Sequence, residues 1–159
     1  MRGVLIMRTQ VADIVAYSAA GELALVVEVK NRLGTTTEWA VEFRRNLAVH
    51  DLLPQAPYFL LATPDRFYLW TRIGAAVDLV KPDVESNPST FLRPYYESAG
   101  LSPETLRGGG FEMFVAAWLA EVQRADGPDC LPEESRELLI DSGLFEAIRG
   151  GSLHRGILE

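Results

Sequence analysis

Hydrophobic and polar residues near the start of the chain are arranged as two strands joined by a turn. Residues 11–17 and 22–30 are mostly apolar or β-branched, and residues 18–21, Ser-Ala-Ala-Gly, are typical of a turn. This pattern predicts a β-hairpin. Residues 23–29 hold a single charged residue, Glu28, so we expect the second strand to be buried on both of its faces.

A helix is predicted directly after the hairpin. Thr35 and Glu38 have the spacing of a capping box, in which each side chain accepts a hydrogen bond from the other residue's free backbone amide. The helix is expected to continue to about His50. Apolar residues recur along it at the spacing of one helix face, which we expect to pack on the sheet: Trp39, Phe43 and Leu47.

Two further strands are predicted beyond this helix. Residues 58–63 form an apolar run, and residues 66–72 show period-two alternation after a turn at Pro64-Asp65. The order strand, strand, helix, strand, strand is typical of an α+β fold with a mixed central β-sheet and flanking helices.

The second half of the chain has a different pattern. Prolines and a triple glycine between residues 74 and 110 predict turns, with one short helix near residues 91–98. Residues 111–123 have the spacing of a strongly apolar helix. A last helix is predicted from Pro132 to Gly150, with acidic residues in its early turns.

Length and composition fit one ordinary globular domain of 159 residues. We expect a sheet-containing core over residues 1–80 and a helical C-terminal extension over residues 81–159, packed on the same domain. The single cysteine, Cys130, excludes an internal disulfide and favours a reducing cytoplasm. No stretch reaches the roughly 18 apolar residues of a membrane span, so we expect a cytoplasmic protein without membrane contact.

The net charge of −7 argues against tight binding of nucleic acid, because lysine and arginine supply most of the affinity for phosphate. The charge is unevenly distributed along the chain. Residues 1–102 carry ten basic and eleven acidic residues, whereas residues 103–159 carry five and eleven. The acidic excess therefore lies in the second half, away from the hairpin.

Asp13, Glu28 and Lys30 are the candidates for chemistry in the hairpin. A four-residue turn would place Asp13 opposite Val26, and strand alternation would then bring all three charged side chains to one face. Two carboxylates supply oxygen ligands to Mg²⁺, whose bound water becomes a nucleophile, and a lysine can orient that water or hold the phosphate. The structural alternative is a solvated pair of Glu28 and Lys30 on the exposed face of a strand.

The spacing of these residues resembles the PD-(D/E)xK nuclease motif. Asp13 is followed after fourteen residues by Glu28 and then by Lys30, with Ala12 in place of the proline. Residues 11–72 resemble the restriction-endonuclease-like domain of small bacterial proteins. The resemblance implies an Mg²⁺-dependent endonuclease that hydrolyses DNA phosphodiester bonds, with Asp13 and Glu28 as metal ligands and Lys30 positioning the attacking water. Mn²⁺ is expected to substitute for Mg²⁺.

Basic residues after the motif are candidates for holding a substrate phosphate: Arg32, Arg44 and Arg45. Two of them lie on the predicted helix, which borders the active site in the nucleases that the sequence resembles. A surface ion pair with Glu42 is the simpler alternative for Arg45.

The sequence leaves a second function open. The segment before the hairpin is too short to supply the helix that usually precedes it in such nucleases, and the second half combines acidic charge with apolar helices. These features favour a catalytically inactive nuclease-fold module that acts as a subunit or interaction protein in a larger bacterial complex. Such a module would form a homo-oligomer or bind a protein partner through its C-terminal helices.

Overall fold

The computed structural model describes residues 10–50, 52–71 and 79–158 of the chain. Six strands are present in these ranges: β1 (Gln10–Tyr17), β2 (Leu23–Val29), β3 (Tyr58–Thr63), β4 (Arg66–Thr71), β5 (Val84–Ser86) and β6 (Ser152–Leu158). The α-helices of the same ranges are α1 (Thr37–Val49), α2 (Ser89–Ala99), α3 (Gly110–Arg124) and α4 (Leu144–Ile148). None of these helices is long and apolar enough to cross a membrane.

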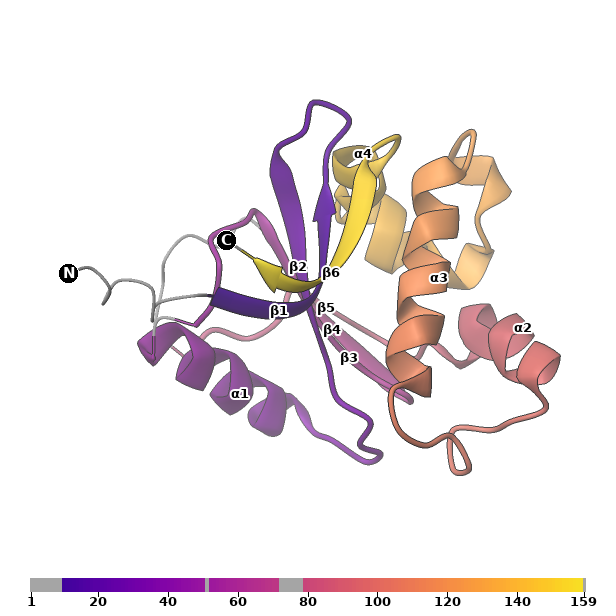
Figure 1. Cartoon of the computed structure of the whole chain (residues 1–159), viewed down its shortest axis with the longest axis horizontal. Coiled ribbons are helices and arrows are strands. Elements are labelled where there is room, and N and C mark those ends of the chain that lie inside the picture. The colour runs from indigo at the N-terminus through magenta and orange to yellow at the C-terminus, as the bar shows by residue number, and fades with distance from the viewer. Residues whose placement is uncertain (1–9, 51, 72–78, 159) are drawn as a thin grey trace.

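The strands form one mixed sheet in the order β5-β4-β3-β2-β1-β6 (Figure 1). β1 and β2 are antiparallel, as expected for a hairpin, and β2 runs parallel to β3 after the crossover through α1. β3 and β4 form a second antiparallel pair. The predicted α+β class with a mixed central sheet and flanking helices is therefore confirmed.

The register of the first hairpin differs from the prediction. Ile14 pairs with Val27, and an irregularity near the turn shifts the pairing of the residues beyond it. Val26 lies opposite Val15, so the predicted position of Asp13 opposite Val26 is wrong. An irregular strand end next to the turn changes every pairing behind it, which a regular four-residue loop does not allow for.

The start of α1 also differs by one residue. The N-cap is Thr36, whose hydroxyl accepts a hydrogen bond from the Trp39 amide at 3.1 Å. Thr35 instead shares a hydrogen bond of 2.8 Å with the Tyr68 hydroxyl on β4. The predicted capping box with Glu38 is therefore wrong, because a tertiary contact takes the side chain of Thr35.

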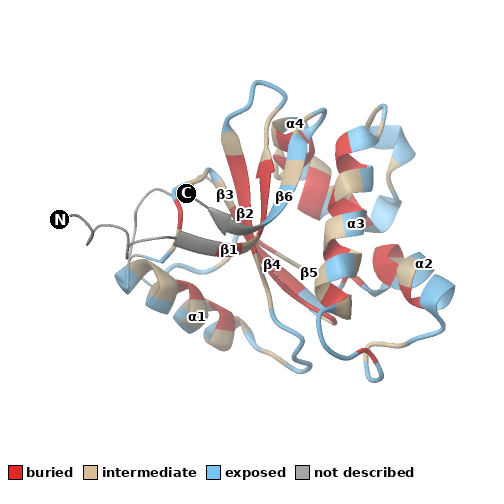
Figure 2. Cartoon of the chain, in the orientation of Figure 1, coloured by how far each residue is buried: buried red, intermediate tan, exposed pale blue. Residues whose placement is uncertain are grey.

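The apolar face of α1 packs on one face of the sheet, as predicted. The helix residues Trp39, Phe43 and Leu47 lie against a buried cluster that includes Val26, Phe59, Tyr68 and Trp70. The opposite face of the sheet is covered by α2, α3 and α4, so the middle of the sheet is buried on both sides (Figure 2). The strand β2 follows this pattern: its central residues 24–27 are all buried, which confirms the expectation for this strand.

The predicted single helix from Pro132 to Gly150 is wrong. The chain there forms a 3₁₀ turn at Glu133–Ser135, a π-helical turn at Glu137–Asp141 and then the short helix α4. Gly143, immediately before α4, has a φ of +89°, a left-handed conformation that interrupts a right-handed helix.

The second half of the chain is not purely helical. It contributes β5 next to β4 and β6 next to β1, so it completes both edges of the sheet. The boundary predicted near residue 80 therefore does not separate a sheet-containing core from a helical extension. Both strands are short or polar at edge positions, where hydrophobic alternation gives a weak signal.

The connection from α4 into β6 requires a glycine. A Cβ atom on Gly151 would lie 1.7 Å from the backbone oxygen of Tyr17 in β1. We expect Gly151→Ala to destabilise the protein by about 3 kcal/mol, because the two strands must move apart to admit the methyl group. Urea unfolding measures this change. Gly109→Ala is the control, since a Cβ there meets no atom within 4 Å, and equal midpoints for the two variants would contradict the close approach of β1 and β6.

Candidate functional site

Asp13 occupies a bulge in β1. The pairing of β1 with β6 shifts between Ala12 and Ile14, so that Asp13 is the extra residue on its strand. Its Oδ2 accepts a hydrogen bond from the Val29 backbone amide at 2.7 Å. The carboxylate therefore lies between β1 and β2 and takes the place of a backbone acceptor at this end of the hairpin.

Glu28 lies beside Asp13 and carries the second carboxylate of the site. Its carboxylate accepts a hydrogen bond from the Asp13 backbone. Burial is the main cause that raises the pKa of Glu28, and the neighbouring charge of Asp13 is the second; together they raise it from 4.5 to about 7. The charge of Lys30 acts in the opposite direction and lowers this pKa.

Lys30 follows β2 directly and points toward α1. Its backbone amide donates to the Ala62 oxygen at 2.9 Å, which continues the pairing of β2 with β3 by one residue. Its Nζ lies 5.2 Å from the centre of the Phe43 ring, a cation–π contact that holds the ammonium near the helix. The structure thus brings Asp13, Glu28 and Lys30 together, although through a register that the sequence did not predict.

The three candidate arginines are placed differently from one another. Arg32 is exposed and lies with its guanidinium carbon 5.5 Å from the Trp39 ring centre, and Arg45 is half-buried. Arg44 is only 1% exposed and lies between α1 and the sheet. Its guanidinium carbon is 5.8 Å from the Trp70 ring centre. Burial lowers the pKa of Arg44. A phosphate in solvent can therefore reach Arg32 and Arg45, whereas the buried side chain of Arg44 is out of its reach.

Two charged residues near the site were missed by the sequence. Arg155 on β6 donates from Nε and Nη2 to Oε2 of Glu112 on α3, at 3.0 and 2.9 Å. The Glu112 charge in turn helps to raise the pKa of Glu28. No local pattern could have found this pair, because its members are 43 residues apart and one of them lies on β6, a strand that the sequence pattern does not predict.

The carboxylates of the site are suited to some metal ions and not to others. Within the described ranges, no group of three or more histidine, cysteine, aspartate or glutamate side chains is placed to hold a metal ion. A structural zinc site, which takes four protein ligands, is therefore not formed by these residues. Asp13 and Glu28 instead offer two oxygen donors, a set that fits Mg²⁺, since this ion keeps several waters and binds through one or two carboxylates.

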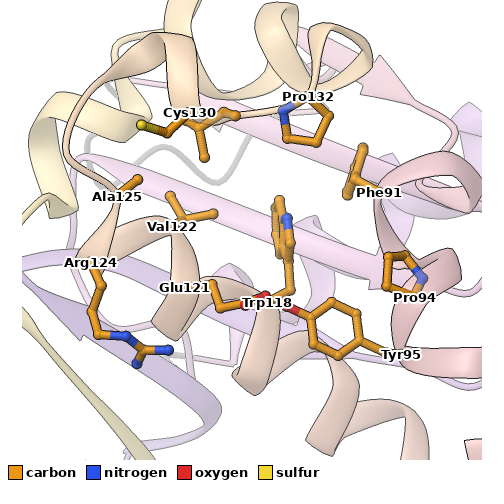
Figure 3. Close-up of a pocket in the computed structure, with 11 residues that line it drawn as sticks. Phe91, Pro94, Tyr95, Trp118, Glu121, Val122, Arg124, Ala125, Cys130 and Pro132 are labelled. Atoms are coloured by element: carbon orange, nitrogen blue, oxygen red, sulfur yellow. The ribbon is translucent and has the colours of Figure 1, made fainter. Parts of the chain in front are cut away.

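A separate cavity of about 490 Å³ lies between α2, α3 and the turn that follows α3 (Figure 3). Phe91, Tyr95 and Trp118 line it, with Cys130 and Pro132 on the facing turn. Neither the carboxylate pair nor Lys30 lines this cavity, so it is not part of the charged site.

Comparisons with protein-family models, with curated proteins and with solved structures find no match to this chain. A proposal for its function therefore rests on the chemistry of its own residues. The cluster of Asp13, Glu28 and Lys30 is the group of side chains from which that chemistry follows.

The raised pKa of Glu28 predicts a dependence of stability on pH. The folded protein favours the protonated carboxyl, so this contribution is complete below the unfolded pKa near 4.5 and is lost as the pH rises through about 7. We expect Glu28→Gln to be more stable than the wild type above pH 7, by on the order of 2 kcal/mol, and to lose this advantage near pH 4. Urea unfolding across this pH range, in the presence of a chelator, measures the difference. A constant difference between the two proteins would show that the carboxyl titrates normally.

Proposed function

We propose that the protein hydrolyses phosphodiester bonds of nucleic acid, with DNA as the expected substrate, in a reaction that depends on a divalent metal ion. The observation that carries this proposal is the pairing of the Asp13 and Glu28 carboxylates at one end of the hairpin, with the Lys30 ammonium close by. Two adjacent carboxylates repel each other, and a bound divalent cation relieves this repulsion.

Asp13 and Glu28 are the residues that would hold Mg²⁺. Each carboxylate already accepts a hydrogen bond from the backbone of the opposite strand. A carboxylate has two oxygens and about four lone pairs, so this bond leaves capacity for a cation while it fixes the side chain. Rigidity of this kind is what a metal site needs from the residues around it.

When bound, the ion makes a coordinated water more acidic and neutralises charge on the phosphate. The remaining chemistry belongs to side chains of this protein. Lys30, oriented by the Phe43 ring, holds the attacking water or a phosphate oxygen as a point charge. Arg32 and Arg45 are accessible to solvent and can contact the nucleic-acid backbone beside the scissile phosphate.

The charge of the chain limits how the substrate is bound. With a net charge of −7, the protein is not expected to bind nucleic acid tightly through non-specific contacts alone. Binding is therefore expected to depend on the metal ion and on the few basic residues around the site. A cytoplasmic location, favoured by the single cysteine, is consistent with such a substrate.

A specific observation also favours the alternative of an inactive module. The hydrogen bonds of Asp13 and Glu28 close the end of the hairpin, so both residues have a structural role that does not require a reaction. In that case the protein would act as a subunit of a larger assembly and bind a second copy or another protein through its C-terminal helices. Its stability would then be independent of Mg²⁺ and Mn²⁺.

Binding of metal is the first property to test. We expect Mn²⁺ at 100 times its Kd to raise the melting temperature of the wild type by about 5–10 °C, because a ligand that binds only the folded state stabilises it. Asp13→Asn should not respond, although its amide oxygen can still accept from Val29. Asp129→Asn, in an exposed turn, is the control and should respond as the wild type does. Equal responses of all three proteins would contradict a metal site at Asp13.

The role of Lys30 predicts a defect in cleavage without a defect in folding. Lys30→Ala is expected to reduce the rate of DNA cleavage in Mg²⁺ by about 100-fold or more, the usual effect of removing one group that stabilises charge in the transition state. Plasmid nicking and the melting temperature are the two measurements. Lys81→Ala removes the other lysine of the chain and should cleave normally. Cleavage by Lys30→Ala at the wild-type rate would remove Lys30 from the mechanism.

A further inference from the structure

An ion pair joins the second half of the chain to the strand that carries Asp13. Arg155 of β6 donates from Nε and Nη2 to Glu112 in the first turn of α3, at 3.0 and 2.9 Å. Both side chains are accessible, Arg155 with 49% and Glu112 with 26% of its area exposed. The guanidinium thus holds a carboxylate oxygen within reach of solvent, with the same chemistry by which arginine holds a phosphate oxygen.

The pair lies next to the candidate site. Arg155 pairs with Ile14, directly beside the bulge in β1. The Glu112 charge acts on Glu28, which places the two carboxylates within electrostatic reach. α3 packs on the face of the sheet opposite α1 (Figure 1). The Lys30 ammonium lies on the α1 side, against the Phe43 ring. The carboxylates of the site therefore have one cation on each side of the sheet.

We propose that Arg155 binds a phosphate of the substrate backbone next to the scissile one, and that Glu112 takes the place of this phosphate when no nucleic acid is bound. The inference rests on the proposed function and deepens it, because it adds a substrate contact from the second half of the chain. Glu112 is a positioning residue in this arrangement. It holds the guanidinium at the edge of the site and competes with the incoming phosphate.

Replacement of the Glu112 carboxylate by a substrate phosphate costs little free energy. Exposed ion pairs contribute little to stability, because water and salt screen them, so release of Glu112 does not weaken the fold appreciably. The released carboxylate stays in the first turn of α3, where the helix dipole favours a negative charge. A phosphate accepts charge-assisted hydrogen bonds from guanidinium at least as well as a carboxylate does.

Binding of a labelled DNA strand, single or duplex, followed by fluorescence anisotropy in Ca²⁺ tests the proposal without cleavage. Arg155→Gln is expected to bind roughly tenfold more weakly, as for one lost charge-assisted hydrogen bond. Its plot of log affinity against log salt should be shallower by about 0.7–0.9, the value for one phosphate contact. Glu112→Gln is expected to bind several-fold more tightly than the wild type, since it removes the competitor.

A second exposed ion pair of the same chain provides the controls. Nε of Arg136 and Oε2 of Glu133 lie 3.6 Å apart in the segment between α3 and α4. Arg136→Gln changes the net charge by the same amount as Arg155→Gln, and Glu133→Gln by the same amount as Glu112→Gln. Neither should alter affinity beyond about twofold, because screened charges away from the site act weakly. All four variants should keep the wild-type melting temperature within a few degrees.

The outcomes separate this inference from the proposed function. Tighter binding by Glu112→Gln than by Glu133→Gln, with weaker binding by Arg155→Gln than by Arg136→Gln, supports it, since a purely structural ion pair would not improve affinity when broken. Equal affinities of Glu112→Gln and Glu133→Gln, or of Arg155→Gln and Arg136→Gln, overturn it. The absence of saturable binding by the wild type overturns it as well. Stabilisation by Mn²⁺ through Asp13 is measured separately, so the metal site can survive the loss of Arg155 as a phosphate ligand.

Discussion

The hydrogen bond from the Val29 amide to the Asp13 carboxylate is the contact on which the geometry of the site depends. The pairing of β1 with β2 extends only to Ile14 and Val27, and the partly buried Val29 amide beyond it would destabilise the sheet if it lacked an acceptor. Asp13 supplies the acceptor, and Glu28 in turn accepts from the Asp13 backbone. The hairpin is thereby closed at its end, with two carboxylates held side by side. Burial of Glu28 and, second, the neighbouring Asp13 charge raise the pKa of Glu28 to about 7.

The layered fold explains why charged residues are tolerated at the end of β2. The middle of β2 is covered on both faces, so a charge in it would be far from water. Glu28 and Lys30 lie where the strand leaves this cover, and Lys30 rests on the ring of Phe43. The same position serves the stability of the hairpin and offers charged groups to a ligand. A structural and a catalytic role for these residues are thus compatible with one another.

The second half of the chain takes part in the site as well as in the core. Its helix α3 and its strand β6 bring Glu112 and Arg155 to the strand that carries Asp13. The Arg155–Glu112 ion pair links the second half of the chain to the region that we propose to receive phosphate. The two halves are therefore joined by electrostatics as well as by packing.

Local patterns determined much of this protein. The first hairpin, α1, the pair β3 and β4, and α3 were predicted because side-chain periodicity is decided by near neighbours, and the spacing of Glu28 and Lys30 alone places them on one face of a strand. Only the tertiary structure decided the position of Asp13 beside Glu28, the burial of Arg44, the division of the last helix and the return of β6 with Arg155. Each of these depends on a bulge, a packed surface or a partner strand formed by residues far away in the sequence, for which a local pattern holds no information.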